Sequence, residues 1–154
     1  MAIERVGIVG AGQMGNGIAH VMSLAGYDVI VNDLSEDALN AAIARIEKNM
    51  LRQVSKGQIE EADMSAALDR ISTSLDVAAL GQSDLVIESA TENEAIKNKI
   101  IEGLIPHLPE HTIVTSNTSS ISITRLASGT DRPERFMGFH FMNPVPVMQL
   151  VELI

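Results

Sequence analysis

The clearest chemical signal in the chain is the glycine pattern of residues 10–15, which reads GAGQMG. It follows a short apolar run at residues 6–9 and precedes a stretch with helical spacing. In a strand–turn–helix unit, such glycines permit a tight turn, close approach of backbone N–H groups to a pyrophosphate, and close helix–strand packing. The residues that we expect at a bound dinucleotide are Gly10, Gly12, Gln13, Met14 and Gly15.

Asp33 stands at the end of the second apolar run, residues 27–33. In dinucleotide-binding folds, an acidic residue about 20 residues past the glycines accepts the ribose hydroxyls. No arginine follows nearby to hold a 2′-phosphate, so the pattern favours NAD over NADP. The alternative is that Asp33 only flanks a helix that begins after Ser35.

Two other polar groups occur in strand-like surroundings. Residues 116–120, SNTSS, directly follow an apolar run, and ligands collect at the carboxyl ends of parallel strands. Ser and Thr are also common in turns, so a structural role for this segment remains open. His140 lies between two phenylalanines, and Glu152 follows in another strand-like run. An imidazole with a carboxylate on its far nitrogen is a standard general base, but the spacing does not show that the two side chains meet.

The elements that must position these groups alternate between strand and helix. The patterns predict strands near 6–9, 27–33, 84–88 and 112–116, and helices near 14–25, 35–56, 60–68 and 94–108. This alternation predicts an α/β fold of Rossmann type, with a doubly wound, mostly parallel sheet. Strand-like runs at 135–141 and 147–154 predict extra strands at the C-terminal end, and residues 35–68 predict a helical hairpin inserted after the second strand. We expect one domain over residues 1–154.

Composition excludes several classes of function. With 154 residues, a formal charge of −9 and 3% aromatic residues, the chain lacks the cationic face and stacking rings of a nucleic-acid-binding protein. No apolar run is long enough for a membrane span, and we expect a soluble, cytoplasmic protein. The absence of cysteine excludes disulfides and Cys-based metal sites, and no pair of histidines has metal-ligand spacing.

Three segments together resemble a known family. Residues 10–19 (GAGQMGNGIA), 116–120 (SNTSS) and 138–152 (GFHFMNPVPVMQLVE) are similar to the NAD-binding domain of the (S)-3-hydroxyacyl-CoA dehydrogenases, especially the bacterial 3-hydroxybutyryl-CoA dehydrogenases. The resemblance implies an acyl-CoA substrate. In the family, an all-helical second domain forms the dimer and completes the substrate cleft. We therefore expect this chain to be a fragment, inactive alone, of a homodimeric enzyme.

The resemblance also implies roles for individual residues of the reaction site. His140 would be the catalytic base, and Glu152 would orient its imidazole and stabilise the protonated form. Ser119 would hydrogen-bond the substrate oxygen, and Asn117 would lie beside the nicotinamide ribose.

Four further positions match family residues with a role in binding. Glu92 and Lys97 match positions near the cofactor. Lys56 matches a lysine that contacts CoA, and Asn49 stands where better-known members have a serine. The family thus implies a CoA site along the predicted helix of residues 35–56.

The basic residues of this helix support a CoA site independently of the resemblance. Arg45, Lys48, Arg52 and Lys56 are spaced three, four and four apart, so they share one face. Such a stripe could attract the phosphates of CoA, although a solvated helix face explains it equally well.

Two other functions are compatible with the glycine pattern. Other β-hydroxyacid dehydrogenases, such as 3-hydroxyisobutyrate or 6-phosphogluconate dehydrogenase, begin similarly but use a lysine as the base. A non-catalytic NAD-binding module would need the glycines but not His140 and Glu152. The segment around His140 favours the hydroxyacyl-CoA dehydrogenases over both.

Overall fold

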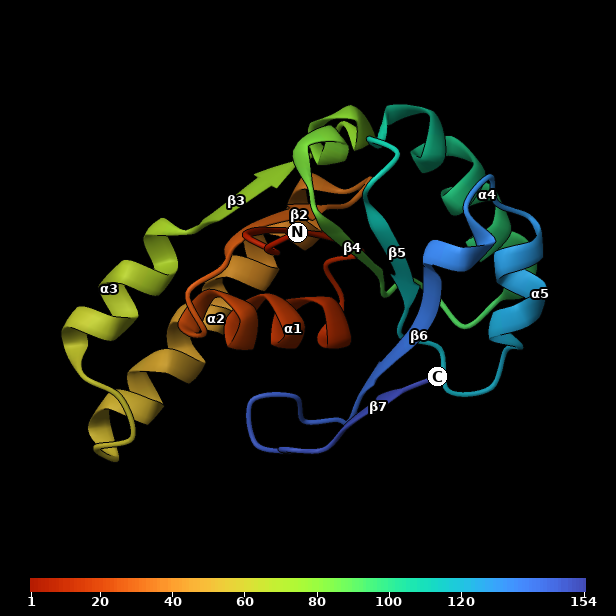
Figure 1. Cartoon of the computed structure of the whole chain (residues 1–154). Coiled ribbons are helices and arrows are strands. Elements are labelled where there is room, and N and C mark those ends of the chain that lie inside the picture. The colour runs from red at the N-terminus through yellow and green to blue at the C-terminus, as the bar shows by residue number, and fades with distance from the viewer.

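One seven-stranded sheet runs through the computed structural model, which describes residues 1–154 (Figure 1). Its strands are, in chain order, β1 Arg5–Val9, β2 Asp28–Asn32, β3 Ile71–Ser74, β4 Leu85–Glu88, β5 Ile113–Ser116, β6 Phe136–Phe141 and β7 Val151–Leu153. The order across the sheet is β3-β2-β1-β4-β5-β6-β7, and every pair is parallel except β6 with β7. The predicted doubly wound fold is confirmed, with the strand order reversing between β1 and β4.

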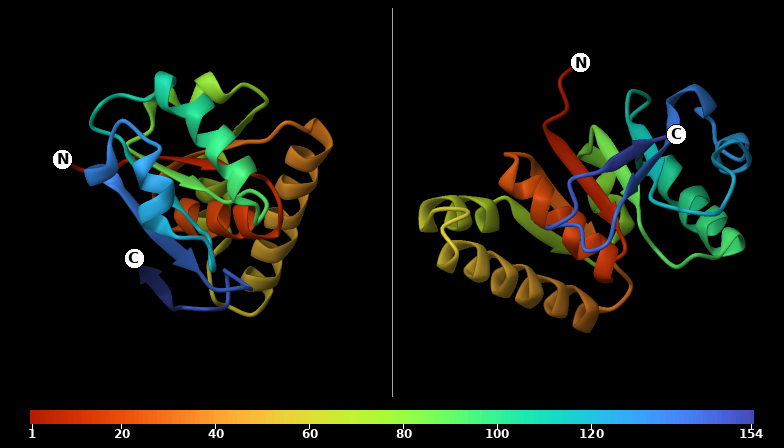
Figure 2. Two further views of the ribbon diagram at one scale, coloured as in Figure 1. Left: turned by 90° about the vertical axis from the view of Figure 1, so that its right-hand side faces the viewer. Right: turned by 90° about the horizontal axis from the view of Figure 1, so that it is seen from below.

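Helices cover both faces of the sheet (Figure 2). The α-helices are α1 Gln13–Leu24, α2 Glu36–Ser55, α3 Glu61–Asp69, α4 Glu94–Leu104 and α5 Ile123–Ser128, and three 3₁₀ turns are η1 Val77–Gln82, η2 Ile105–His107 and η3 Pro133–Arg135. Side chains alternate along each strand, so the two faces form two separate cores. One core packs against α1 and α2, and the other packs against α4 and α5.

The predicted helical hairpin after β2 is formed by α2 and α3. Ser35 caps α2, because its Oγ accepts a hydrogen bond of 3.2 Å from the Ala38 N–H. Gly57 ends the helix with a φ of +69°, a conformation that favours glycine. Ile46 and Met50 lie one turn apart on α2 and are fully buried, so one face of the helix packs on the core.

Several elements of the structure differ from the predicted ones. β3 and α5 are additional elements, and the helix predicted to reach residue 108 changes to a 3₁₀ turn after Leu104. The strand predicted over residues 147–154 is limited to Val151–Leu153. Because β3 and β7 are edge strands with one neighbour each, tertiary pairing rather than an apolar run defines them.

The structure contains neither a membrane-spanning helix nor a cluster of metal-binding side chains. None of the helices combines the length and hydrophobicity that crossing a membrane requires. No group of three or more His, Cys, Asp or Glu side chains is arranged to hold a metal ion.

Candidate cofactor and catalytic site

The glycine turn connects β1 to α1 at the centre of the sheet. Gly10 has a φ of +98°, in the region that favours glycine. A Cβ added to Gly15 would lie 1.8 Å from the Gly10 carbonyl oxygen, so this position requires glycine for helix–turn contact. A Cβ added to Gly12 would meet nothing within 4 Å. The space above Gly12 is therefore open to a ligand.

The first turn of α1 presents free backbone donors to this space. Gly12 is the N-cap residue and no side chain caps the helix, and the Gln13 and Met14 N–H groups have no acceptor in the chain. Such N–H groups and the helix dipole together favour an anion. The turn thus fits a pyrophosphate group.

Asp33 joins the end of β2 to the glycine turn. Its Oδ2 accepts a hydrogen bond of 2.9 Å from the Ala11 N–H, and its Oδ1 accepts one of 3.0 Å from the Ser35 N–H. Asp33 therefore does flank the start of α2, as the alternative interpretation held, but it also orders the turn. The half-buried carboxylate remains at the cavity edge, where it can accept further hydrogen bonds.

A cavity of about 340 Å³ adjoins the turn, at the point where the strand order reverses. Its walls are largely apolar and are formed by Val9, Gly10, Asn32, Asp33, Leu34, Val77, Ala90, Ile96, Lys99, Ile100 and Gly103. A largely apolar cavity with a carboxylate at its edge suits a nucleoside. No local sequence pattern places Ile96 and Ile100 in this wall, because only the fold brings α4 and the end of β2 to the same cavity.

Beneath the loop after β4 lies a buried ion pair. The Lys97 Nζ donates to both carboxylate oxygens of Glu88, at 2.8 and 2.9 Å, and to the Ala90 carbonyl oxygen at 3.2 Å. Glu88 also accepts from the Ser116 hydroxyl at 2.7 Å and from the Ala90 N–H at 2.7 Å. Lys97 is only 1% exposed. The ammonium group of Lys97 thus holds Glu88 and the loop after β4 together, and its expected place near the cofactor stays a prediction.

In the polar segment after β5, most side chains form hydrogen bonds within the chain, and one hydroxyl does not. Asn117 Oδ1 accepts a hydrogen bond of 2.7 Å from the Phe141 N–H, which fixes β5 to β6. Glu92 accepts hydrogen bonds from the hydroxyls of Thr118 and Ser120. Ser119 is exposed and its hydroxyl has no partner in the chain. Of this segment, Ser119 has the hydroxyl that is free for a ligand.

His140 and Glu152 meet across the antiparallel pair β6–β7. They are direct register partners, and His140 Nδ1 lies 3.3 Å from Glu152 Oε2. The His140 side chain is 18% exposed and the Glu152 side chain 50% exposed. His140 Nε2 has no partner in the chain, so one nitrogen is oriented by a carboxylate while the other is available for proton transfer.

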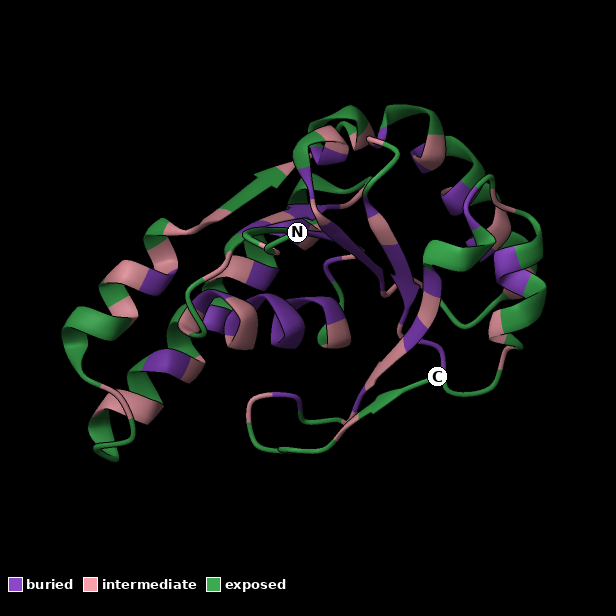
Figure 3. Cartoon of the chain, in the orientation of Figure 1, coloured by how far each residue is buried: buried purple, intermediate pink, exposed green.

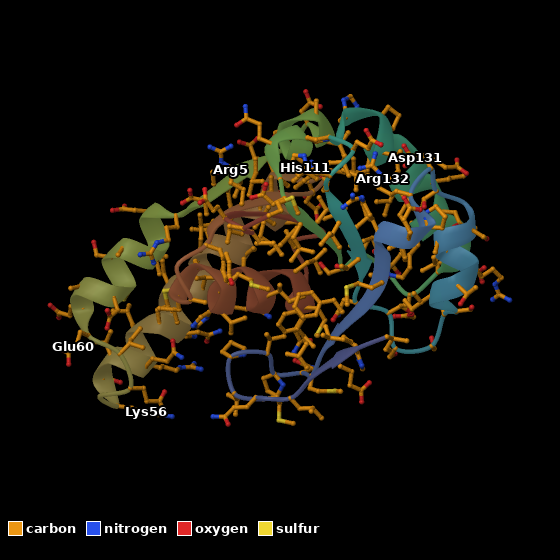
Figure 4. All side chains as sticks on the ribbon, viewed as in Figure 1. Arg5, Lys56, Glu60, His111, Asp131 and Arg132 are labelled. Carbon is orange, nitrogen blue, oxygen red and sulfur yellow. The ribbon has the colours of Figure 1, made fainter.

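The basic stripe of α2 faces the segment that follows β6. Two hollows of about 340 and 390 Å³ lie between them and share Asn49, Arg52, Pro144 and Pro146. Lys56, at the C-terminal end of α2 (Figure 4), lines the larger hollow. We name the two hollows together the basic groove; the basic side chains of α2 form one wall of it and are also exposed to solvent.

A model of the family described as "3-hydroxyacyl-CoA dehydrogenase, NAD binding domain" matches residues 5–154. The chain is 57% identical over 152 residues to a 3-hydroxybutyryl-CoA dehydrogenase of Bradyrhizobium diazoefficiens, covering 99% of this chain and 52% of that protein. It is 40% identical over 152 residues to a 3-hydroxyadipyl-CoA dehydrogenase of Escherichia coli, covering 99% of this chain and 32% of that protein.

Solved structures show the same similarity. The crystal structure of (S)-3-hydroxybutyryl-CoA dehydrogenase from Ralstonia eutropha matches with a TM-score of 0.96 and 47% identity, over 99% of this chain and 54% of that one. The chain spans about half the length of the 3-hydroxybutyryl-CoA dehydrogenases that it matches.

Proposed function

The chain belongs to the 3-hydroxyacyl-CoA dehydrogenase family, as an NAD-binding domain, and we propose that it is the cofactor-binding part of an enzyme that interconverts (S)-3-hydroxyacyl-CoA and 3-oxoacyl-CoA. The expected substrate is 3-hydroxybutyryl-CoA. The observation that carries the proposal is the contact of His140 Nδ1 with Glu152 at 3.3 Å, which leaves Nε2 available.

His140 acts as the general base in the oxidation direction. Glu152 holds the N–H on Nδ1, so the lone pair on Nε2 can take the proton of the 3-hydroxyl group as C3 loses a hydride. Bound NAD supplies the acceptor for that hydride. The Glu152 carboxylate then stabilises the imidazolium, and the exposed Ser119 hydroxyl donates a hydrogen bond to the substrate oxygen.

The residues of the turn and the adjacent cavity fit the cofactor. The open space over Gly12 and the free N–H groups of Gln13 and Met14 suit its pyrophosphate. Asp33 is suited to the adenosine ribose. On the reaction side, we assign Asn117 and Glu92 to the neighbourhood of the nicotinamide, since both lie on loops that follow β4 and β5.

The basic groove is the proposed site for the CoA moiety. Lys56 and Asn49 line it, as the resemblance implies, together with Arg52. Its cationic side chains provide charge for the phosphates of CoA in a chain with a net charge of −9.

The lysine-dependent β-hydroxyacid dehydrogenases are a poorer match to this site. Lys97, the lysine closest to the loops after β4 and β5, has its ammonium group bound to Glu88 and Ala90. A non-catalytic NAD-binding module would leave the His140–Glu152 contact without a use.

We further propose that residues 1–154 are one domain of a longer, homodimeric enzyme, with an all-helical second domain that completes the substrate cleft. Two observations support this. The chain covers about half of its relatives, and β7 and the residues before it are largely exposed (Figure 3), with large apolar residues among them. Leu150 is 58% exposed and Leu153 is 67% exposed.

The test compares the 154-residue chain with a chain that continues after Ile154 with the remaining half of the Ralstonia eutropha relative. Oxidation of NADH with acetoacetyl-CoA is followed by absorbance. We expect turnover by the longer chain and none by the shorter one, while both bind NADH. Absence of turnover in a longer chain that is folded and binds NADH would contradict the proposed activity.

A further inference from the structure

His20 and Gln53 form a polar contact behind the wall of the basic groove. His20 is on α1 and is completely buried. Its Nε2 lies 2.7 Å from Oε1 of Gln53, which is on α2. Its Nδ1 is buried and has no hydrogen-bond partner. The catalytic machinery described above uses neither residue.

The missing partner of Nδ1 determines how the contact is arranged. Burial lowers the pKa of His20, more than the Gln53 hydrogen bond raises it, so the ring is neutral and carries one N–H. With that hydrogen on Nε2, His20 donates to Gln53 Oε1 and buries only a lone pair at Nδ1. The other tautomer would bury an N–H without an acceptor, which is the costlier state.

This arrangement directs the amide nitrogen of Gln53 away from His20. Gln53 is half-buried and lines the hollow of about 390 Å³ together with Arg52 and Lys56. Its Nε2 has no acceptor in the chain, so two N–H groups are available beside two cationic side chains.

We propose that Gln53 is a ligand-contacting residue of the basic groove, and that His20 is the buried positioning residue that aims its amide group at an acceptor oxygen of the CoA moiety. The inference rests on the proposed function and adds a determinant to its substrate site. Arg52 and Lys56 attract any polyanion by charge. A donor fixed from behind instead requires an oxygen at one position, so it contributes specificity that charge alone cannot supply.

Binding of CoA to the 154-residue chain, measured by calorimetry, tests the role of Gln53. Gln53→Met keeps the size of the side chain and removes the donors, and we expect CoA to bind about 3- to 10-fold more weakly. Gln58→Met is the matched control, because Gln58 lines the same hollow without a buried partner, and it should change the affinity by less than about 2-fold. NADH affinity should be unchanged in both variants.

The role of His20 has two independent readouts. By NMR, the His20 ring should be the Nε2–H tautomer, and the side-chain amide signals of Gln53 should shift when CoA is added. His20→Leu should weaken CoA binding as much as Gln53→Met does, and the double variant should be no weaker than either single one. His20→Gln restores a donor to Gln53 Oε1 and should recover most of the affinity. Thermal melting of each variant checks that the fold is intact.

The outcomes distinguish this inference from the proposed function. No CoA binding by the unaltered chain, or CoA binding that does not depend on Lys56, would overturn the CoA site and this inference with it. Normal CoA binding that Gln53→Met leaves unchanged, or that Gln58→Met weakens equally, would overturn the inference alone. An Nδ1–H tautomer of His20 would also overturn it.

Discussion

The glycine turn and the β6–β7 hairpin hold the two halves of the proposed site in different ways. The turn lies at the middle of the sheet, where two contacts hold its backbone. The Asp33 carboxylate accepts a hydrogen bond of 2.9 Å from the Ala11 N–H, and Gly15 packs directly on Gly10. The hairpin lies at the sheet edge, and its second strand has three residues. Its His140–Glu152 contact is 3.3 Å long, and half of the Glu152 side chain is exposed.

In the proposed function, cofactor binding and proton transfer would therefore depend on separate parts of the chain. The turn derives its geometry from β1, α1 and β2, which pack in one core. The His140–Glu152 pair depends on strand pairing at the edge of the sheet, where backbone hydrogen bonds open more readily. Substitutions in the two regions should therefore separate cofactor affinity from turnover.

The largest expected effect is that of His140→Gln in a chain extended to the length of its relatives. Removing the general base should lower turnover about 10²–10⁴-fold, the range for acid–base catalysis. NADH affinity should stay within about 2-fold, because the glycine turn is untouched. Steady-state kinetics and NADH titration measure the two quantities. Nearly full turnover in this variant would remove His140 from the mechanism.

Gly12→Ala and Gly15→Ala should show which glycine of the turn leaves room for the cofactor and which is needed for folding. A methyl group at Gly15 meets the Gly10 carbonyl oxygen at 1.8 Å, so this variant should lose about 1–3 kcal/mol of folding free energy and bind NADH poorly. A methyl group at Gly12 enters open space, so that variant should keep its melting temperature but lose NADH affinity. Thermal melting and NADH titration test both. If Gly12→Ala binds NADH normally, the pyrophosphate does not lie over this residue.

Asp33→Ala should have a moderate effect on cofactor choice. The carboxylate binds the Ala11 N–H and is placed to accept ribose hydroxyls and to repel a 2′-phosphate. We expect NADH affinity to fall about 10-fold, with a smaller change for NADPH. Titration with both cofactors measures the preference. Equal affinity of the unaltered chain for NADH and NADPH would contradict the role of Asp33.

The smallest expected effect is a pH dependence of stability from His20, which is buried on α1, the helix that begins at the glycine turn. Burial lowers the pKa of His20 in the folded state below its unfolded value of about 6.5. Its contribution to stability is therefore complete above pH 6.5 and is lost as the pH falls through the folded pKa. The melting temperature should fall between pH 7 and pH 5 more steeply for the unaltered chain than for His20→Gln. Identical slopes would exclude this effect.

The sequence by itself determined the features that depend on neighbouring residues. The GAGQMG pattern predicts a turn with an open Gly12 and a packed Gly15, because glycine geometry is a local property. The helix predicted over residues 35–56 matches α2, which Ser35 caps and which ends before Gly57 with its positive φ. The alternation of strands and helices predicts a parallel sheet, and a ligand site at its carboxyl edge follows from that topology.

Only the tertiary structure decided which distant side chains meet. The register of β6 with β7 brings His140 to Glu152, and the connection from β4 to α4 places the Lys97 ammonium group on Glu88. The packing of α1 on α2 pairs His20 with Gln53. Strand β3 forms only because β2 offers its free edge. The physical reason is common to all four: hydrogen-bond partners and burial depend on groups far apart in the chain, and no local pattern encodes their distance.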